Sequence, residues 1–529
     1  MALVTKGGDG PRPSGNEPAS AQQHPGGPGS ESEVDKALRA ASRAWPAAEA
    51  IITNPGQPGG TLTWADLDRQ TAGLAAWLEE AIRACGAGSW AIEAGTGKAG
   101  PSLLLLIAAL RTDIPVVLLD ESASGEERQA ARDELHRAGL SMLVASAETD
   151  RGAQPEVHHA PGRGVNPPPE PLPRHAIILA SGGTTGRIKL IVDTALRQPT
   201  SPVMRLSITS QLNWSADQTQ LVIGRLHHAA PLTFFLRGLI DGNRLLVPER
   251  FAPSIAVRII AEQRVHWLQA TPLQLQRMAA WLQRHPADTG SLRGVLHMSA
   301  PCPPPVKRFW IDRIGPDWVF EIYGATEGIG MTVASGGEWL ARPGTVGKGF
   351  FTQLRILDET MTPLSPGRSG LIFLRSLAAS PSRYLREAGG LRISPDGFRS
   401  LGDHGRLDEQ GYLYLEPRRV DMMNVAGENV YPSEVEAVLT RCPGIADAAV
   451  TGVADDRLGT RPVAFITCWP EAQLSERDII EFCRQHLSRF KLPKRVLVVD
   501  EIPYTSAGKI DRRKLPGLLQ ERVLGSVEA

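Results

Sequence analysis

The segment ILASGGTTGRIKLIVDT, residues 178–194, places a loop rich in glycine and threonine between two apolar, β-branched runs. Such runs predict strands. The loop contains Ser181, Gly182, Gly183, Thr184, Thr185 and Gly186, and Lys189 follows it. Glycines let backbone N–H groups converge and the hydroxyls add donors, so the loop is typical of a phosphate-binding nest. A plain hairpin turn is the alternative for this loop taken alone.

The loop differs from the phosphate loop of P-loop NTPases. That pattern requires Gly-Lys, then Ser or Thr, and then a helix, whereas Gly186 is followed by Arg187 and a strand-like run. A second candidate, GTGK at residues 95–98, has Ala99 in place of the hydroxyl and Ile92 in place of the first glycine. We therefore interpret residues 95–98 as a turn and exclude a P-loop NTPase.

Helical and strand patterns alternate around the loop. Residues 61–86 carry apolar side chains at helical spacing, and IPVVLLD at residues 114–120 indicates a buried strand. This alternation predicts an α/β fold with a large, multi-layer N-terminal αβ domain in which sheets pack with helices. Residues 402–418 predict a hairpin, after which a new αβ series begins. We expect a disordered arm at residues 1–34, an N-terminal domain at 35–417 and a small C-terminal domain at 418–529.

Composition narrows the class of protein. A formal net charge of zero over 529 residues gives no support for a nucleic-acid or anionic-membrane partner. Residues 1–34 have no apolar run that suits a signal peptide, and the most apolar segment, residues 103–110, is too short to cross a bilayer. The five cysteines lack the spacing of metal ligands, so we expect reduced thiols. Together these features predict a cytoplasmic protein without a membrane span.

Four later motifs accompany the loop in a fixed order. They are EIYGATEG (321–328), GDHGRLDEQGYLYLEPR (402–418), MNVAGENVYPSEVE (423–436) and YTSAGKIDRRKL (504–515). With ASGGTTGRIK (180–189), they identify the chain as a member of the adenylate-forming superfamily, which includes acyl-CoA synthetases and aryl-acid ligases. The resemblance implies a large N-terminal domain and a small, mobile C-terminal α+β domain. It also implies that a carboxylate attacks ATP to give an acyl-adenylate, from which a thiol, commonly coenzyme A, displaces AMP.

The resemblance assigns roles in nucleotide binding. Thr184 and Thr185 would contact the β- and γ-phosphates, and Lys189 would assist them. Tyr323 would lie against adenine, Thr326 would reach the α-phosphate, and Glu327 would bind Mg²⁺, a hard cation that carboxylates suit. The remaining positions implied to line the nucleotide are Ser299, Ala300, Pro301 and Gly324.

The resemblance assigns further roles near the boundary of the two domains. Asp403 would accept from the ribose hydroxyls, and Arg418 would hold the nucleotide at the hinge. Lys509 would reach the α-phosphate and the substrate carboxylate, where a cation stabilises the developing charge. Gly427 would pack along the pantetheine tunnel, where a side chain would obstruct the thiol. Val420 departs from the Asp or Lys usual at the hinge, which puts the second half-reaction in question.

The stretch RLHHAAPLTFFLRGL, residues 225–239, aligns with the border of the acid site. His228 corresponds to the position that gates the carboxylate, although a buried structural histidine is the alternative. No aspartate is present to pair with an ammonium group, so an α-amino acid substrate is not expected. Ala229 and Ala230 leave room, and the pocket is predicted to be wide and apolar, suited to a bulky carboxylic acid.

The leading hypothesis is therefore an ATP-dependent acid–CoA ligase using Mg²⁺. An adenylase that delivers its acyl group to a separate carrier protein is the close alternative. A luciferase-like oxidoreductase or a nucleotide-binding protein without catalysis would share the motifs, although Glu327 and Lys509 argue against the latter. A homodimer is possible.

Overall fold

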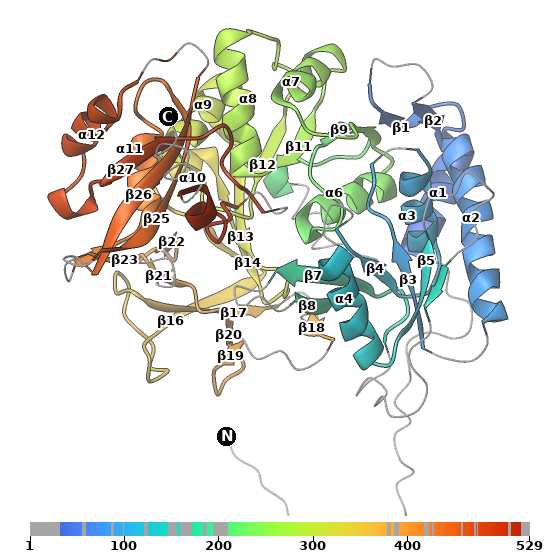
Figure 1. The fold of residues 1–529 in the computed structure, drawn as a ribbon. Helices are drawn as coiled ribbons and strands as arrows, with labels where there is room; N and C mark the ends of the chain where they lie inside the picture. The colour runs from blue at the N-terminus through green and yellow to red at the C-terminus, as the bar shows by residue number, and fades with distance from the viewer. Residues whose placement is uncertain are drawn as a thin grey trace, which may run out of the picture.

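The computed structural model describes residues 32–519, apart from short internal gaps (Figure 1). The ranges outside the description are 1–31, 56–59, 86–88, 99, 121–124, 146–155, 159–171, 183–187, 194–209, 378–381, 386–390, 417–422, 426–427, 456–458, 470–471, 473, 506–508 and 520–529.

A nine-stranded sheet forms one half of the large domain, in the order β15-β14-β13-β12-β11-β9-β10-β1-β2. Its strands are β1 (Glu49–Thr53), β2 (Thr61–Thr63), β9 (Thr219–Val222), β10 (Arg244–Val247), β11 (Trp267–Ala270), β12 (Gly294–His297), β13 (Val319–Gly324), β14 (Met331–Ser335) and β15 (Lys348–Phe350). The run from β13 to β1 is parallel, whereas β2, β14 and β15 are antiparallel to their neighbours. The carboxyl ends of β9, β11, β12 and β13 therefore lie at one edge.

A seven-stranded sheet, in the order β18-β8-β7-β4-β3-β5-β6, forms the other half. Its strands are β3 (Trp90–Ala94), β4 (Val116–Leu118), β5 (Ser141–Ala145), β6 (Glu156–His158), β7 (Ile177–Gly182), β8 (Ile188–Asp193) and β18 (Arg383–Tyr384). The two predicted strands beside the opening loop are β7 and β8, and they pair antiparallel from Ile177↔Asp193 to Gly182↔Ile188. The loop thus joins two paired strands, as predicted.

Helices separate and cover the two sheets (Figure 1). Those of the large domain are α1 (Glu33–Ala44), α2 (Trp64–Ala84), α3 (Gly100–Arg111), α4 (Gly125–Arg137), α6 (Ala229–Ile240), α7 (Pro253–Glu262), α8 (Pro272–Arg284), α9 (Pro304–Ile314) and α10 (Gly336–Ala341). The core between the sheets draws on α1, α2, α3 and α6. A second core lies between the nine-stranded sheet and α7, α8 and α9, and a third lies between the seven-stranded sheet and α4. This layering is the multi-layer αβ architecture that the alternating pattern predicts.

A third sheet precedes the C-terminal domain. It consists of β16 (Thr352–Leu357), β17 (Gly370–Ser376), β19 (Arg392–Ile393), β20 (Arg399–Ser400), β21 (His404–Leu407) and β22 (Leu413–Leu415). The antiparallel pair β21 and β22 is the predicted hairpin. Its turn is fixed by the Asp408 carboxylate, which accepts backbone N–H bonds from Gln410 and Tyr412, both 2.9 Å.

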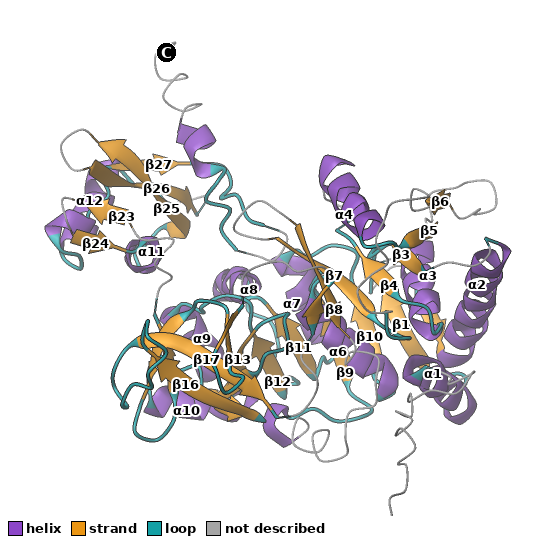
Figure 2. Cartoon of the chain, turned by 90° about the horizontal axis from the view of Figure 1, so that it is seen from below, coloured by secondary structure: helices purple, strands orange, loops and turns teal. Residues whose placement is uncertain are grey.

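The C-terminal lobe is a smaller unit beside the large domain (Figure 2). It contains β23 (Met423–Val425), β24 (Glu428–Val430), α11 (Pro432–Leu439), β25 (Ile445–Asp455), β26 (Gly459–Cys468), α12 (Glu476–Arg484) and β27 (Arg495–Val498). Its own apolar core joins α11 and α12 to the sheet. The predicted boundary near residue 417 falls outside the described residues, so its position stays a prediction.

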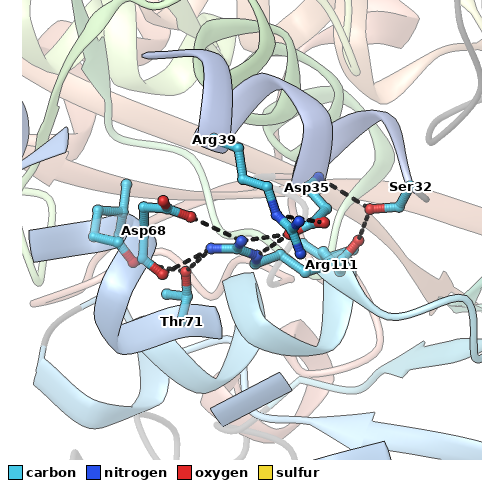
Figure 3. A network of polar contacts seen from close by, with 8 residues as sticks. Ser32, Asp35, Arg39, Asp68, Thr71 and Arg111 are labelled. Atoms are coloured by element: carbon cyan, nitrogen blue, oxygen red, sulfur yellow. Dashed lines mark hydrogen bonds and ion pairs between the residues drawn. The ribbon is translucent and has the colours of Figure 1, made fainter. Parts of the chain in front are cut away.

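A buried arginine fastens α1 to the body of the large domain (Figure 3). The guanidinium of Arg111 donates from Nε to Asp35 in α1 at 2.6 Å and from Nη1 to Thr71 in α2 at 2.8 Å. Ser32 caps α1 by accepting from the Asp35 backbone N–H at 3.1 Å, and Val34 is fully buried. The expectation of an arm at residues 1–34 was therefore wrong at its end, because the fold begins by Ser32.

The part of the chain that the structure describes has no helix long and apolar enough to cross a membrane.

Candidate functional site

Most predicted site residues that the structure describes follow the carboxyl ends of the parallel strands. His228 follows β9, Ser299 follows β12, and Tyr323 lies at the end of β13. In open α/β sheets, ligands bind outside the carboxyl ends of the strands, where loops present side chains and backbone groups. This edge is therefore the candidate active site.

Tyr323 and Asp403 meet although they are eighty residues apart in the sequence. The Tyr323 hydroxyl donates to Asp403 Oδ2 at 3.0 Å. The Asp403 backbone carbonyl accepts from the Ile372 N–H at 2.9 Å, which fixes the aspartate to β17. The structure thus brings together the two side chains predicted to contact adenine and ribose.

Glu327 has a partner that the sequence analysis did not identify. The hydroxyl of Tyr384, in β18, donates to Glu327 Oε1 at 2.9 Å. Burial, together with the negative charge of Glu327, raises the pKa of Tyr384 well above its usual range, so the hydroxyl remains a donor. The Lys189 ammonium lies 5.5 Å from the centre of the Tyr384 ring. Tyr384 therefore links the predicted metal ligand to the lysine that follows the predicted phosphate loop.

The segment that carries Tyr384 connects the two large sheets. Arg383 and Tyr384 pair with β8, and the Ser382 hydroxyl donates to Asp193 Oδ2 at 3.1 Å. Gly328 has φ +62°, and a Cβ there would lie 3.0 Å from Ser382 Oγ. A side chain at Gly328 would thus meet both an unfavourable backbone conformation and a close neighbour. The glycine after Glu327 allows this approach of the two sheets.

A buried ion pair supports the edge from the α9 side. Lys307 in α9 donates to Glu321 in β13, and both side chains are almost completely buried. His297 at the end of β12 lies 3.8 Å from Glu321 and is also fully buried. Burial and the nearby Lys307 charge lower the pKa of His297, so the ring is neutral. The strand that ends in Tyr323 is therefore anchored to α9 beneath the site.

Ser299, Ala300 and Pro301 lie between β12 and α9. Ser299 has φ +82°, a left-handed conformation that non-glycine residues rarely adopt. Such residues concentrate at functional sites, where the surrounding structure maintains the strain. The backbone strain at Ser299 agrees with its predicted place beside the nucleotide.

His228, in the part of the site predicted to bind the carboxylic acid substrate, is the N-cap residue of α6. The rings of His227 and His228 are 4.1 Å apart between centroids. Burial, and then the neighbouring His228, lower the pKa of His227 to about 3, so its ring is neutral at physiological pH. Ala229 and Ala230 begin the helix and are half-buried. The role of His228 as a gate stays a prediction.

Further along α6, Phe234 belongs to a buried apolar cluster. The Phe234 ring of α6 packs against Trp267, with centroids 4.8 Å apart, and Trp214 and Met331 join the same cluster. This cluster is part of the core, since Trp267 is fully buried and begins β11 at the amino end of the strand.

Lys509 lies on a hairpin of the C-terminal lobe. The Thr505 N–H donates to the Lys509 carbonyl at 2.7 Å, and Tyr504 forms a bridge with Ile510. Lys509 itself is exposed. Lys509, the predicted catalytic lysine, is therefore an exposed residue of this hairpin.

Several predicted site residues cannot be placed. Gly183, Thr184, Thr185, Gly186, Arg418, Val420 and Gly427 lie outside the described residues. Ser181 and Gly182 are placed as the last residues of β7, without their side chains. The assigned roles of these residues stay predictions.

The GTGK stretch, residues 95–98, lies within the described part of the chain. It follows β3, and Lys98 is buried, with its ammonium donating to the Val222 carbonyl at 3.1 Å. Burial, and then Arg225, lower the pKa of Lys98 to about 7. This lysine links the two large sheets and is not presented to a phosphate.

The site suits a magnesium ion that is held mainly by phosphates. Among the described residues, no group of three or more His, Cys, Asp or Glu side chains could hold a metal. Mg²⁺ commonly takes one or two protein carboxylates and completes its shell with phosphate oxygens and water. A single, oriented Glu327 carboxylate fits that mode of binding.

Comparison with known proteins agrees with this geometry. The family described as AMP-binding enzyme matches residues 85–381, and the AMP-binding enzyme C-terminal domain matches residues 434–509. A 2-succinylbenzoate–CoA ligase of Bacillus licheniformis is 29% identical over 76% of this chain and 84% of its own length. A ligase of the same name from Geobacillus kaustophilus is 32% identical over 65% of this chain and 69% of its own length.

A solved structure has the same fold. The o-succinylbenzoate CoA synthetase of Bacillus subtilis, in complex with its acyl-adenylate intermediate, matches with a TM-score of 0.69 and 23% identity. The match covers 90% of this chain and 97% of that one. The fold class and the family that the motifs predict are confirmed. The chain belongs to the AMP-binding enzyme family.

Proposed function

We propose that the protein is an ATP-dependent ligase that converts a bulky, apolar or aryl carboxylic acid into an acyl-adenylate and then into its CoA thioester. Membership of the AMP-binding enzyme family supports the first step. The relatives named 2-succinylbenzoate–CoA ligase support an aryl acid and CoA as substrates. ATP, Mg²⁺ and CoA are the required small molecules.

One observation carries this proposal. The Tyr323–Asp403 hydrogen bond and the Tyr384–Glu327 hydrogen bond converge on the end of β13, from three different sheets. The first pair offers an aromatic ring and a carboxylate to a nucleoside, and the second orients a carboxylate for a phosphate-bound cation. A nucleoside and its phosphates require both features side by side.

The reaction brings two anions together. The acid carboxylate must attack the α-phosphorus of ATP, and pyrophosphate must leave. Mg²⁺, when bound at Glu327, screens the phosphate charge and assists the leaving pyrophosphate. Thr326 would hold the α-phosphate, and the Lys509 ammonium would lie between the two reactants and stabilise the charge of the transition state.

The acid side favours an apolar substrate. Ala229 and Ala230 leave space at the start of α6, and residues 225–239 contain no acidic side chain. An ammonium group without a carboxylate partner in an apolar pocket would cost several kcal/mol, so amino acids are disfavoured. His228, the N-cap residue of α6, directly precedes these alanines, and we assign to it the position beside the substrate carboxylate.

A pyrophosphate-exchange assay over a panel of acids tests the proposal. The panel contains 2-succinylbenzoate, benzoate, anthranilate and a fatty acid, with phenylalanine as the control for an ammonium group. We expect exchange with at least one aryl or bulky apolar acid, and formation of a thioester when CoA is added. Exchange with phenylalanine alone, or no exchange at all, would contradict the proposal.

The same assay separates the acceptors. Acyl-adenylate that forms but is not consumed by CoA would favour an external carrier protein as the thiol donor, and oxygen consumption would indicate a luciferase-like oxidoreductase. A cytoplasmic location and a homodimer belong to the same proposal. Light scattering of the purified protein tests the dimer.

A further inference from the structure

One face of α8 contacts the C-terminal lobe. Gln276 Nε2 donates to the Ala446 carbonyl at 3.1 Å, and the Arg277 guanidinium lies 5.9 Å from the centre of the Tyr504 ring. At the end of the helix, the Arg284 guanidinium lies 4.4 Å from the Trp469 ring. Arg277 and Arg284 are seven residues apart, so both project from the same side of the helix. The contact face of α8 consists of Gln276, Arg277 and Arg284.

Tyr504 is held from the side of the lobe as well. Its hydroxyl donates to Asp447 Oδ2 at 2.8 Å, and Asp447 lies at the start of β25. Burial, followed by the Asp447 charge, raises the pKa of Tyr504, so the hydroxyl stays a donor. The Tyr504 side chain therefore lies between a carboxylate of the lobe and a guanidinium of the large domain.

Tyr504 is also the base of the hairpin that carries Lys509. It forms a bridge with Ile510, directly after the lysine. On the returning strand, Arg512 donates to both oxygens of Glu436 in α11, at 2.7 and 2.9 Å. Because both strands are anchored within the lobe, a contact at Tyr504 fixes the hairpin as a unit relative to α8.

The other end of α8 leads to the candidate active site. The helix starts at Pro272, directly after β11, whose carboxyl end lies at the edge that bears Tyr323 and Ser299. At 1.5 Å per residue, Arg277 lies only about 8 Å along the helix from Pro272. The Lys509 hairpin is thus docked on an element that starts at the nucleotide edge.

We propose that the contact face of α8 is the docking site that positions the C-terminal lobe for adenylation, with Arg277 as the positioning residue. This inference rests on the proposed function. Arg277 acts through Tyr504 on Lys509 and touches no substrate. Acyl-adenylate formation, in which Lys509 takes part, requires the Arg277 contact. Thioester formation from a supplied acyl-adenylate does not require it.

The test compares Arg277→Ala with two other variants. Arg277→Lys keeps a cation over the Tyr504 ring. Arg293→Ala is the matched control, because the Arg293 guanidinium lies 5.3 Å from the Trp318 ring, a contact of the same kind within the large domain. For each variant, pyrophosphate exchange reports adenylation, and CoA thioester formation from supplied acyl-adenylate reports the second step.

We expect Arg277→Ala to lower exchange about tenfold, the size of effect that loss of a partly desolvated cation–π contact produces. Thioester formation should change less than about twofold. Arg277→Lys should recover most of the exchange, and Arg293→Ala should leave both steps unchanged. Equal loss in both steps, loss of the second step alone, or no loss would overturn the inference.

Hydrogen exchange at the backbone gives a readout that does not require activity. Arg277→Ala should speed deuterium uptake across residues 503–511, where the Thr505 amide is bonded to the Lys509 carbonyl. Unchanged uptake would overturn the docking site. A wild-type protein without pyrophosphate exchange would instead refute the proposed function, while the uptake comparison would still decide whether α8 holds the hairpin.

Discussion

The two parts of the candidate site are held in different ways. The edge at the end of β13 is fixed by the buried Lys307–Glu321 pair and by the Tyr323–Asp403 bond, within the cores of the large domain. The Lys509 hairpin belongs to a separate lobe, and Lys509 itself is exposed. One part of the site is therefore built into a core, and the other is brought to it by a docked lobe.

This difference predicts that variants in the two parts of the site affect different steps of the reaction. A change that weakens the edge should damage the stability of the large domain and both half-reactions. A change in the hairpin or its docking contacts should damage adenylation alone. The following variants test that distinction.

The largest expected effect is on stability. Lys307→Met leaves Glu321 buried without its cation, and breaking a buried pair in this way costs about 3–5 kcal/mol. Denaturant unfolding should show this loss, whereas Lys36→Met, which removes an exposed lysine paired with Glu33, should cost less than about 1 kcal/mol. Similar losses in the two variants would mean that the edge is not fixed by its ion pair.

The next effect separates the half-reactions. Lys509→Ala should lower adenylation by about a hundredfold or more, because a preorganised charge is lost from the transition state. Thioester formation from supplied acyl-adenylate should change little. Lys514→Ala, which removes an exposed lysine five residues later, is the control. An equal fall in both half-reactions would reject the assigned role of Lys509.

A smaller effect concerns the predicted metal ligand. Tyr384→Phe removes the hydrogen bond to Glu327, and a bond to a charged group contributes about 1.5–3 kcal/mol, so we expect a loss of about tenfold in pyrophosphate exchange. When exchange is measured at increasing Mg²⁺ concentrations, the variant should need a higher Mg²⁺ concentration to reach half of its maximal rate. Tyr412→Phe, which removes a similar bond to Glu338, should leave that requirement unchanged. An unaltered Mg²⁺ dependence in Tyr384→Phe would argue against Glu327 as a ligand.

The smallest effect is a pH dependence of stability. The native pKa of Lys98 is lowered to about 7 from 10.5, so between these values the unfolded chain binds a proton that the native chain lacks. The free energy of unfolding therefore rises with pH in this range, by at most about 1.4 kcal/mol per unit. Wild type should gain stability relative to Lys98→Met between about pH 8 and about pH 9. Equal pH dependence in both proteins would show that Lys98 is charged in the fold.

Local sequence patterns predicted much of the fold. Within residues 61–86, the predicted helix appears as α2 over residues 64–84, preceded by the short strand β2. Residues 114–120 contain β4, and the hairpin signal at residues 402–418 appears as β21 and β22. These elements have a regular spacing of apolar residues or a turn of fixed chemistry. The start of α1 was missed because Glu33 and Val34 follow a polar stretch. Contacts that are distant in the sequence hold this helix, among them the bond from Arg111 to Asp35.

The site was predicted less completely. The motifs located Tyr323, Glu327 and Asp403, and the structure brings Tyr323 and Asp403 into contact. Tyr384 was missed because its importance arises from the pairing of β18 with β8 and from the close approach of Ser382 to Gly328, neither of which has a local signature. The burial of Lys98 was missed for the same reason, since its acceptor, the Val222 carbonyl, belongs to the other large sheet.

The central claim is that Lys509, carried by the docked lobe, completes a nucleotide site at the edge of the nine-stranded sheet. The most direct test is a crystal structure of the protein with a non-hydrolysable acyl-adenylate analogue. We predict that the ribose lies on Asp403, the adenine lies beside Tyr323, and Lys509 Nζ lies within hydrogen-bonding distance of the group that replaces the α-phosphate. An analogue bound away from this edge, or bound there with Lys509 turned away and Arg277 still on Tyr504, would contradict the account.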